Sequence, residues 1–303
     1  MRLWFPVTLM AALAAMSAPL AVSAKDTFQP EAMSPADAAL AGRAVTRGWL
    51  MYAYDQAAWH GTDDMAAKMP DYASKAEGWI VDGPANATHL IFYSKDQDNP
   101  KAVYVADFRD LKLVSSRVIG PSDDATLTPA QLGLIEARRR AKAAMYDAKV
   151  GFCAKAAPNS IVLPPERPGG PYLVYFMTPQ TGDATVPIGG HYLFEVAETG
   201  RVSGPRVFTK SCMELPIEGK PGNKKLTSLL TTDVLDPVPT EVHVFTTFAV
   251  HVPLFVMTTQ NRRVWGIEII GGTARIRLVG ETQKMGTVPS TPVADIKHRG
   301  IAS

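Results

Sequence analysis

The order of the predicted elements constrains the fold more than any single motif in the chain. One helix is followed by a set of short strands, and the same order then repeats. The first helix begins at Ser34-Pro35-Ala36-Asp37 and is expected to end near Trp59, while the second begins at Thr128-Pro129-Ala130-Gln131 and runs to about Asp147. Each start places a capping hydroxyl before a proline at the first helical position. The pattern predicts an α+β fold, mainly antiparallel β, with two helix-plus-meander units followed by a C-terminal β-meander.

Short runs of aromatic and β-branched residues predict the strands. Turn and linker residues divide these runs into three groups. We therefore expect helix-on-meander units at residues 25–120 and 121–214. Residues 215–303 are expected to be a meander and tail, either separate or in one domain with 121–214. The expected strands are 79–81, 88–93, 102–106 and 112–114, then 160–163, 172–177, 192–197 and 206–210, and finally 241–248, 254–259, 263–270 and 273–278.

The first 24 residues have the features of a secretory signal peptide. Arg2 is their only charged side chain, residues 3–15 are largely apolar, and Val22-Ser23-Ala24 offers small residues at a cleavage site. Pro6 and Pro19 interrupt the apolar run, which falls short of the ~20 residues that a membrane span needs. We expect a periplasmic protein with no stable membrane span after cleavage; an uncleaved anchor and full secretion are the alternatives.

The charge balance and the absence of familiar motifs exclude several functional classes. The chain has 31 basic and 29 acidic residues, a balance that creates no strong field toward nucleic acid or anionic lipid. The sequence contains no P-loop, no G-x-G-x-x-G, no G-x-S-x-G and no H-E-x-x-H pattern. We therefore expect no nucleic-acid partner and no cofactor.

The chain has two cysteines, Cys153 and Cys212. In an oxidising compartment an isolated pair usually forms a disulfide, and the closed loop would contribute roughly 4 kcal/mol in the chain-entropy account. The spacing is not the C-x-x-C of redox proteins. The sequence therefore predicts a structural disulfide between Cys153 and Cys212.

Histidines near the C-terminal meander form the only metal-site candidate that the spacing suggests. On a strand, Glu241 and His243 share one face, and His251 shares it too if the strand runs straight. A carboxylate and two imidazoles could hold zinc or another transition metal. Because the spacing matches no known metal signature, we favour a solvated strand face. His191, after Gly189-Gly190, is interpreted as part of a turn before a strand.

Two further clusters have both a structural and a functional interpretation. The aromatic residues Trp49, Tyr52, Tyr54 and Trp59 of the first helix could line a ligand groove, but packing of the helix across its meander explains Trp49, Tyr52 and Trp59 without one, and we favour this packing. Arg138-Arg139-Arg140 with Lys142 could contact an anionic polymer or lipid headgroups, but we expect a solvated helix face, because three consecutive helical residues point in different directions and form no flat cluster.

Taken together, these features favour an exported, non-catalytic binding or interaction protein whose partner is an unknown protein or a small ligand. Short strands with many edges could recruit a partner strand. The alternative is a periplasmic hydrolase, metal-dependent through Glu241, His243 and His251, with His191 nearby. A purely structural envelope component is a third possibility.

Overall fold

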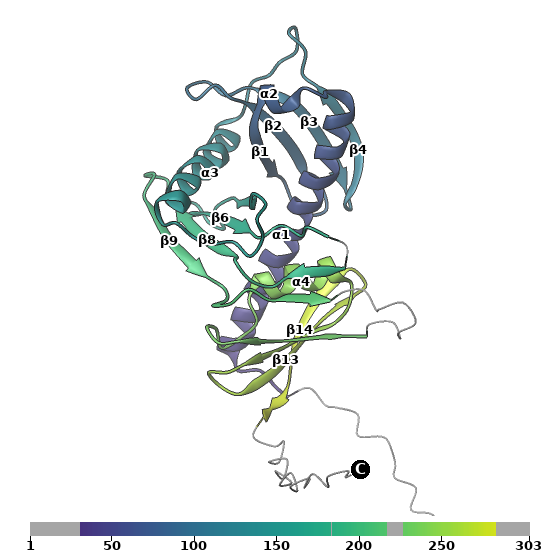
Figure 1. The fold of residues 1–303 in the computed structure, drawn as a ribbon, viewed down its shortest axis with the longest axis vertical. Helices are drawn as coiled ribbons and strands as arrows, with labels where there is room; N and C mark the ends of the chain where they lie inside the picture. The colour runs from purple at the N-terminus through teal and green to yellow at the C-terminus, as the bar shows by residue number, and fades with distance from the viewer. Residues whose placement is uncertain (1–30, 183, 217–226, 283–303) are drawn as a thin grey trace, which may run out of the picture.

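The computed structural model describes residues 31–182, 184–216 and 227–282 (Figure 1). Its four helices and mainly antiparallel sheets confirm the predicted α+β fold. The predicted signal peptide, residues 1–24, lies outside the described residues, as does the chain after Thr282. In the described ranges, no helix is long and apolar enough to cross a membrane.

The upper sheet in Figure 1 is an antiparallel meander of four strands in chain order. All four predicted strands of this region are present. They are β1 (Ala76–Asp82), β2 (His89–Ser94), β3 (Ala102–Arg109) and β4 (Lys112–Val118), with the single helical turn α2 (Tyr72–Lys75) before β1.

Helix α1 (Pro35–Lys68) runs from the lower part of the molecule to the upper sheet (Figure 1). Its 34 residues span about 50 Å. The side chain of Ser34 caps it as predicted, by accepting a hydrogen bond from the Asp37 N–H. The predicted end near Trp59 is wrong, and His60 lies within the helix. The helix continues through Gly61. A Cβ at this position would collide with the side chain of Leu90, so glycine here lets the helix and the sheet approach closely.

The middle sheet is a second antiparallel set of four strands, in the order β5-β6-β8-β9. Helix α3 (Pro129–Asp147) precedes it and begins with the predicted capping box of Thr128 and Gln131. The predicted strand 206–210 is displaced toward the N-terminus. The strands are β5 (Asn159–Leu163), β6 (Tyr172–Met177), β8 (Tyr192–Val196) and β9 (Val202–Val207).

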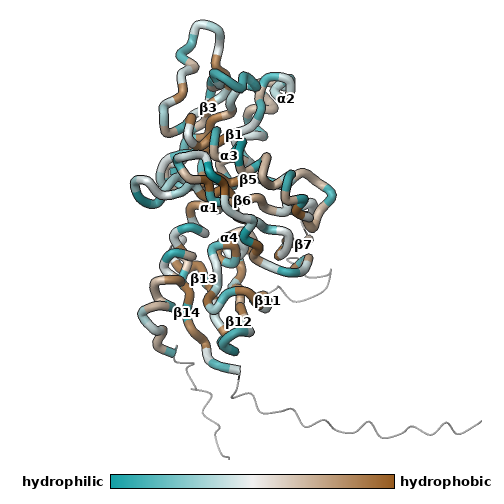
Figure 2. The backbone as a smooth tube through the Cα atoms, turned by 90° about the vertical axis from the view of Figure 1, so that its left-hand side faces the viewer, coloured by the Kyte–Doolittle hydropathy of each residue, from teal (hydrophilic) through white to brown (hydrophobic). Residues whose placement is uncertain are grey.

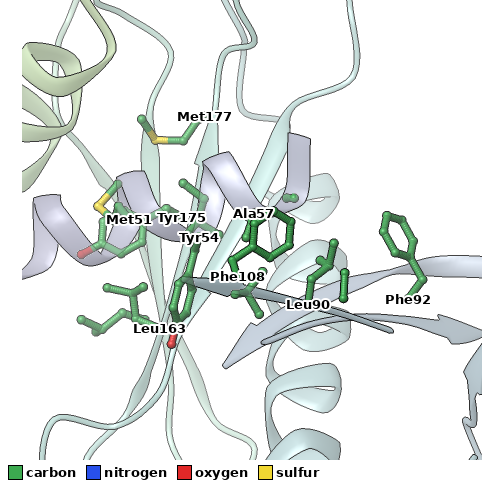
Figure 3. Packing of buried hydrophobic residues seen from close by; sticks show 14 of the residues in the cluster. Met51, Tyr54, Ala57, Leu90, Phe92, Phe108, Leu163, Tyr175 and Met177 are labelled. Atoms are coloured by element: carbon green, nitrogen blue, oxygen red, sulfur yellow. The ribbon is translucent and has the colours of Figure 1, made fainter. Parts of the chain in front are cut away.

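The two sheets lie side by side and share their cores, with α1 on one face and α3 on the other. Alternate residues of β2 separate accordingly: Leu90 joins the cluster around α1, and Ile91 joins the cluster around α3. On β6, Tyr175 and Phe176 divide in the same way. Figure 3 shows the α1 side of this core, with Met51, Tyr54, Ala57, Leu90, Phe108, Leu163 and Tyr175. The predicted unit boundaries at 120 and 214 remain a prediction.

The lower sheet contains β11 (Leu229–Asp233), β12 (Leu254–Thr258), β13 (Arg263–Ile270) and β14 (Thr273–Glu281) in that order. Strand β11 was not predicted, and it pairs with β12 in parallel, whereas the other pairs are antiparallel. A short two-strand ribbon of β7 (Thr185–Pro187) and β10 (Glu214–Pro216) lies outside the three large sheets.

Residues 241–248, predicted as a strand, form helix α4 (Glu241–Val250). The physical reason is that β11 and β12 are parallel, and a parallel pair needs a long crossover that is usually helical. Valine, phenylalanine and threonine suit a strand by propensity, but α4 packs between α1 and the lower sheet, so nearly all of its faces are buried. Gly48 of α1 permits this contact, because a Cβ there would lie 2.5 Å from the Cβ of Val244.

The hydropathy of the chain follows these layers. Figure 2 shows hydrophobic residues concentrated along the packed helices and strands and hydrophilic residues in the connecting loops. The core of the lower part combines α4, the start of α1 and the lower sheet, with Trp265 fully buried at its centre. Helix α1 therefore contributes to both the upper and the lower cores and connects them.

The predicted solvated arginine run is wrong for two of its three residues. Arg138 is buried, donates to the Tyr93 hydroxyl at 2.9 Å and the Ser160 hydroxyl at 2.9 Å, and lies over the Trp79 ring. Arg139 forms an ion pair with Glu77 at 2.6 Å. Because α3 packs against two sheets, two of the three directions that the run points in meet protein.

Candidate functional site

A cleft of about 720 Å³ lies where α1 and α4 meet the upper and middle sheets. β1 contributes Trp79, β5 contributes Asn159 to Ile161, and the loop after β6 closes one wall. Six aromatic side chains line the cleft; they are Tyr52, Trp59, Tyr72, Trp79, Phe92 and Phe245. Phe92 and Met177 belong to the cleft wall as well as to the core around α1.

Helix α1 presents one continuous stripe to this cleft. The residues are Tyr52, Asp55, Gln56, Trp59, Thr62 and Asp63. Their spacing of three and four residues places them on one face of the helix. The stripe mixes large rings with carboxyl and amide groups, which is the composition of many small-molecule sites.

Asp55 is the acid set deepest in the cleft. Its side chain is half-buried and forms no ion pair with any residue in the described parts of the chain. Burial raises the pKa of this carboxyl to about 6, and a hydrogen bond from the neighbouring Gln56 side chain opposes the shift. An unpaired acid with a raised pKa in a cleft is a functional-site signal with a physical cause, the loss of hydration around its charge.

The wall opposite α1 is built around His191 and Thr178. The Thr178 N–H donates to Nδ1 of His191 at 3.1 Å, and Nε2 lies 3.2 Å from the Pro187 carbonyl. Both ring nitrogens are thus used within the wall, and burial lowers the pKa of His191 to about 4. Gly190, with φ of +69°, forms the predicted turn before the strand.

The predicted disulfide is present and reinforces the same wall. Cys153 and Cys212 are bonded, with their Cα atoms 5.4 Å apart. The Cys153 N–H donates to the Thr178 hydroxyl at 3.2 Å, and that hydroxyl donates to the Gly189 carbonyl at 2.8 Å. The disulfide therefore fixes the two segments that hold His191 against the cleft.

The aromatic residues of α1 divide between core and cleft. Tyr54 is buried and donates to the Gly83 carbonyl. Trp49 packs as predicted, but on Phe248 of α4, with ring centroids 4.9 Å apart, and not on the meander. Tyr52 is buried but lines the cleft. For Trp59 the packing interpretation is wrong: its side chain is 59% exposed, at the mouth of the cleft, and stacks on His60.

The predicted metal ligands do not come together. Across residues 31–182, 184–216 and 227–282, no three acidic, histidine or cysteine side chains are placed to hold a metal ion. The reason is the helical conformation of α4, on which Glu241 and His243 point in different directions. His243 is buried, accepts a hydrogen bond from the Thr240 N–H at 3.1 Å and helps cap the helix. His251 is exposed and lines the cleft instead.

Glu241 belongs to a buried polar network that joins three parts of the fold. The Tyr175 hydroxyl of the middle sheet donates to Glu241 at 2.8 Å. Nη1 of Arg47 on α1 lies 3.7 Å from Glu241, and its Nε and Nη2 donate to Glu166 at 2.6 and 3.0 Å. These groups satisfy one another, so the network holds α1, α4 and the middle sheet together.

Sequence reasoning raised a ligand groove at Tyr52 and Trp59 but favoured core packing for both, and it missed Asp55. The usable signal was the position of this acid, three residues after Tyr52 and four before Trp59, on a helix otherwise rich in alanine and aromatic residues. The residues from β1, β5 and α4 carry no such signal, because only the fold brings them to one cleft. No protein-family model, curated protein or solved structure matches this chain.

Proposed function

We propose that this protein is an exported binding protein whose cleft takes a small organic ligand without transforming it. The observation that carries the proposal is the cleft itself, about 720 Å³ in volume and lined by six aromatic side chains together with polar residues from α1, β5, the loop after β6 and α4. Small-molecule sites typically enclose roughly 300–1,000 Å³, are lined by apolar and aromatic side chains, and lie where structural layers meet.

The proposed compartment is the periplasm. The signal-peptide pattern of residues 1–24 supports export, and the disulfide between Cys153 and Cys212 fits an oxidising environment. The disulfide lies beside Thr178 of the cleft wall, so the compartment that forms it would also stabilise the binding site.

Two of the cleft's reactive groups, His191 and Ser160, support a non-catalytic role, while Asp55 and His251, which also line the cleft, are assigned to binding. Both ring nitrogens of His191 have partners in the wall, which leaves no free nitrogen to act as a base. The Ser160 hydroxyl accepts a hydrogen bond at 2.9 Å from Arg138, a residue that is far away in the sequence but adjacent in the core. A nucleophile needs a base within hydrogen-bond reach, and the partner of the Ser160 hydroxyl is an arginine donor, not a base.

The proposal is tested with N-phenyl-1-naphthylamine, a neutral aromatic molecule whose fluorescence rises in apolar surroundings. We expect saturable binding to the mature protein and at least about tenfold weaker binding to Trp59→Ala, because the indole supplies exposed aromatic surface at the mouth. Tyr146→Ala is the matched control: Tyr146 is an exposed helical aromatic residue on α3, away from the cleft.

Two results would contradict the proposal. One is the absence of saturable binding to the folded protein. The other is equal binding to the wild type and to Trp59→Ala, which would place the dye elsewhere on the surface. Circular dichroism of each variant confirms that the comparison is made between folded proteins.

A further inference from the structure

The charges that line the cleft have one sign. Its described lining residues include the carboxyl groups of Asp55 and Asp63 but no lysine and no arginine. Asp55 lies deeper, and Asp63 is exposed at the edge. A site of this kind disfavours anionic ligands, because they would meet like charge with no cation to compensate.

In the described part of the chain Asp55 lacks a basic partner, whereas Glu77 and Asp236 each have one. Asp233 lacks one too, but it accepts hydrogen bonds from the Leu235 and Asp236 N–H groups and does not line the cleft. Glu77 pairs with Arg139 at 2.6 Å, and Asp236 pairs with Arg206 at 2.9 Å. For Asp55, no lysine or arginine nitrogen in the described part of the chain lies within 4 Å. A half-buried carboxylate without a counter-ion is costly to keep, so its position facing a cavity indicates that something outside the chain compensates it.

Aromatic residues flank Asp55 along α1 and share the lining of the cleft with it. Tyr52 and Trp59 lie one turn before and one turn after Asp55 on the same helix face. The Phe245 ring from α4 lies 6.3 Å from the Tyr52 ring, centroid to centroid and edge-on. The pKa of the Tyr52 hydroxyl is raised by burial and then by the charge of Asp55.

We infer, resting on the proposed binding function, that the ligand is an organic cation, an amine with an apolar or aromatic body. Its ammonium group would pair with the Asp55 carboxylate, and its body would lie against Tyr52, Trp59 and Phe245. Aromatic faces attract ammonium groups by about 0.5–2 kcal/mol, more when water is excluded. A cation restores to Asp55 the compensation that the chain does not provide.

Few other titratable groups face Asp55, and they come from four places. Helix α1 contributes Tyr52 and Asp63, and α2 contributes Tyr72. His191 lies in the wall before β8 and His251 at the end of α4. His191 stays neutral above about pH 5 because burial lowers its pKa to about 4.

The test compares three probes of similar shape and different charge by titration calorimetry: tryptamine, tryptophol and indole-3-acetate. At pH 7.5 we expect tryptamine to bind at least about tenfold more tightly than tryptophol, and indole-3-acetate to bind most weakly. Tryptamine affinity should rise about tenfold between pH 5 and pH 7, since the ionised fraction of an acid with a pKa of about 6 rises by that factor. Tryptophol affinity should stay constant over this range.

Asp55→Asn keeps the shape of the side chain and removes its charge. It should abolish both the preference for tryptamine and the pH dependence, while Glu136→Gln, an exposed acid on α3, should leave both unchanged. A cleft that binds N-phenyl-1-naphthylamine but does not prefer tryptamine over tryptophol overturns the cation inference and leaves the binding function standing. Failure of the naphthylamine and all three indoles to bind overturns the binding function itself.

Discussion

Arg138 and Asp55 are both ionisable side chains on helices that pack against the upper and middle sheets, yet the chain treats them differently. Arg138 is buried, donates to two hydroxyl groups and lies over an aromatic ring. Asp55 is half-buried beside a cavity and has only the neighbouring Gln56 side chain as a hydrogen-bond partner. Glu241 differs from the acids of the cleft in the same way, because it accepts a hydrogen bond from Tyr175 and forms an ion pair with Arg47.

This comparison distinguishes polar side chains that stabilise the fold from polar side chains that lower its stability. Satisfied buried polar groups are costly to break, since removing one partner leaves the others buried and unpaired. A carboxylate shielded from water without a counter-ion destabilises the native state, and function is one reason for such a group to persist. Substitutions in the two regions should therefore change the free energy of unfolding in opposite directions.

The largest effect is expected from Arg138→Ala. The substitution leaves the Tyr93 and Ser160 hydroxyls without their partner and opens a cavity beside Trp79. We expect the free energy of unfolding to fall by about 3 kcal/mol, measured by urea denaturation of the oxidised protein.

Arg140→Ala is the matched control two residues later on the same helix. Arg140 pairs with Glu136 in an exposed i,i+4 ion pair, so its removal should change the free energy of unfolding by less than about 0.5 kcal/mol. Equal effects of the two substitutions would show that Arg138 does not stabilise the core in the way its contacts indicate.

Arg138 and Arg140 also show what could not be predicted from the sequence alone. The sequence located α3 and its cap, because capping depends on residues three positions apart. It could not distinguish Arg138 from Arg140, because their environments are set by β1, β2 and β5, which are remote in the sequence. The disulfide was predictable from two cysteines and a predicted export signal, whereas its position beside Thr178 of the cleft wall was not.

The metal-site candidate fails for a related reason. Alternation of Glu241, Val242, His243 and Val244 satisfies a strand pattern locally, but the parallel pairing of β11 with β12 requires a crossover helix at this point. Strand β11 carried too weak a signal to reveal that pairing. In the first helix, by contrast, the spacing of Tyr52 and Trp59 was visible, and only their division between core and cleft needed the fold.

The second prediction concerns Asp55→Asn, which should stabilise the protein at neutral pH. Because the pKa of Asp55 in the folded protein is about 6, above its ordinary value of 3.8, the folded state holds this proton more tightly than the unfolded chain does. The stability contributed by Asp55 is therefore greatest at low pH and declines as the pH rises from about 4 to about 6. Above pH 7 the variant should gain about 2 kcal/mol, less than the ~3 kcal/mol that the raised pKa implies, because water reaches the side chain through the cleft.

The pH profile of the difference isolates this residue from the other titrating groups. The buried His191 and His243, whose pKa values burial lowers to about 4, act in the opposite direction in both proteins and cancel in the difference. The gain of Asp55→Asn over the wild type should approach zero near pH 4 and reach its plateau above pH 6 to 7. A variant that is less stable than the wild type at pH 7.5 would mean that Asp55 is a satisfied framework group after all.

The smallest effect is expected at the other end of the cleft, from His251→Gly. His251 ends α4 with φ of +56°, a left-handed conformation that disfavours residues with a side chain. Glycine should relieve this strain and keep the backbone hydrogen bond to the Thr247 carbonyl, raising the free energy of unfolding by about 0.5–1 kcal/mol after its own chain entropy is subtracted. Arg262→Gly, at φ of +58° in the turn before β13, should give a similar gain outside the cleft.

Only His251→Gly should weaken binding of N-phenyl-1-naphthylamine, by about threefold, because only His251 lines the cleft. Equal affinities of the two variants for the dye would mean that His251 ends the helix without contributing to binding. The contrast between framework and cleft would then rest on Asp55 and Trp59.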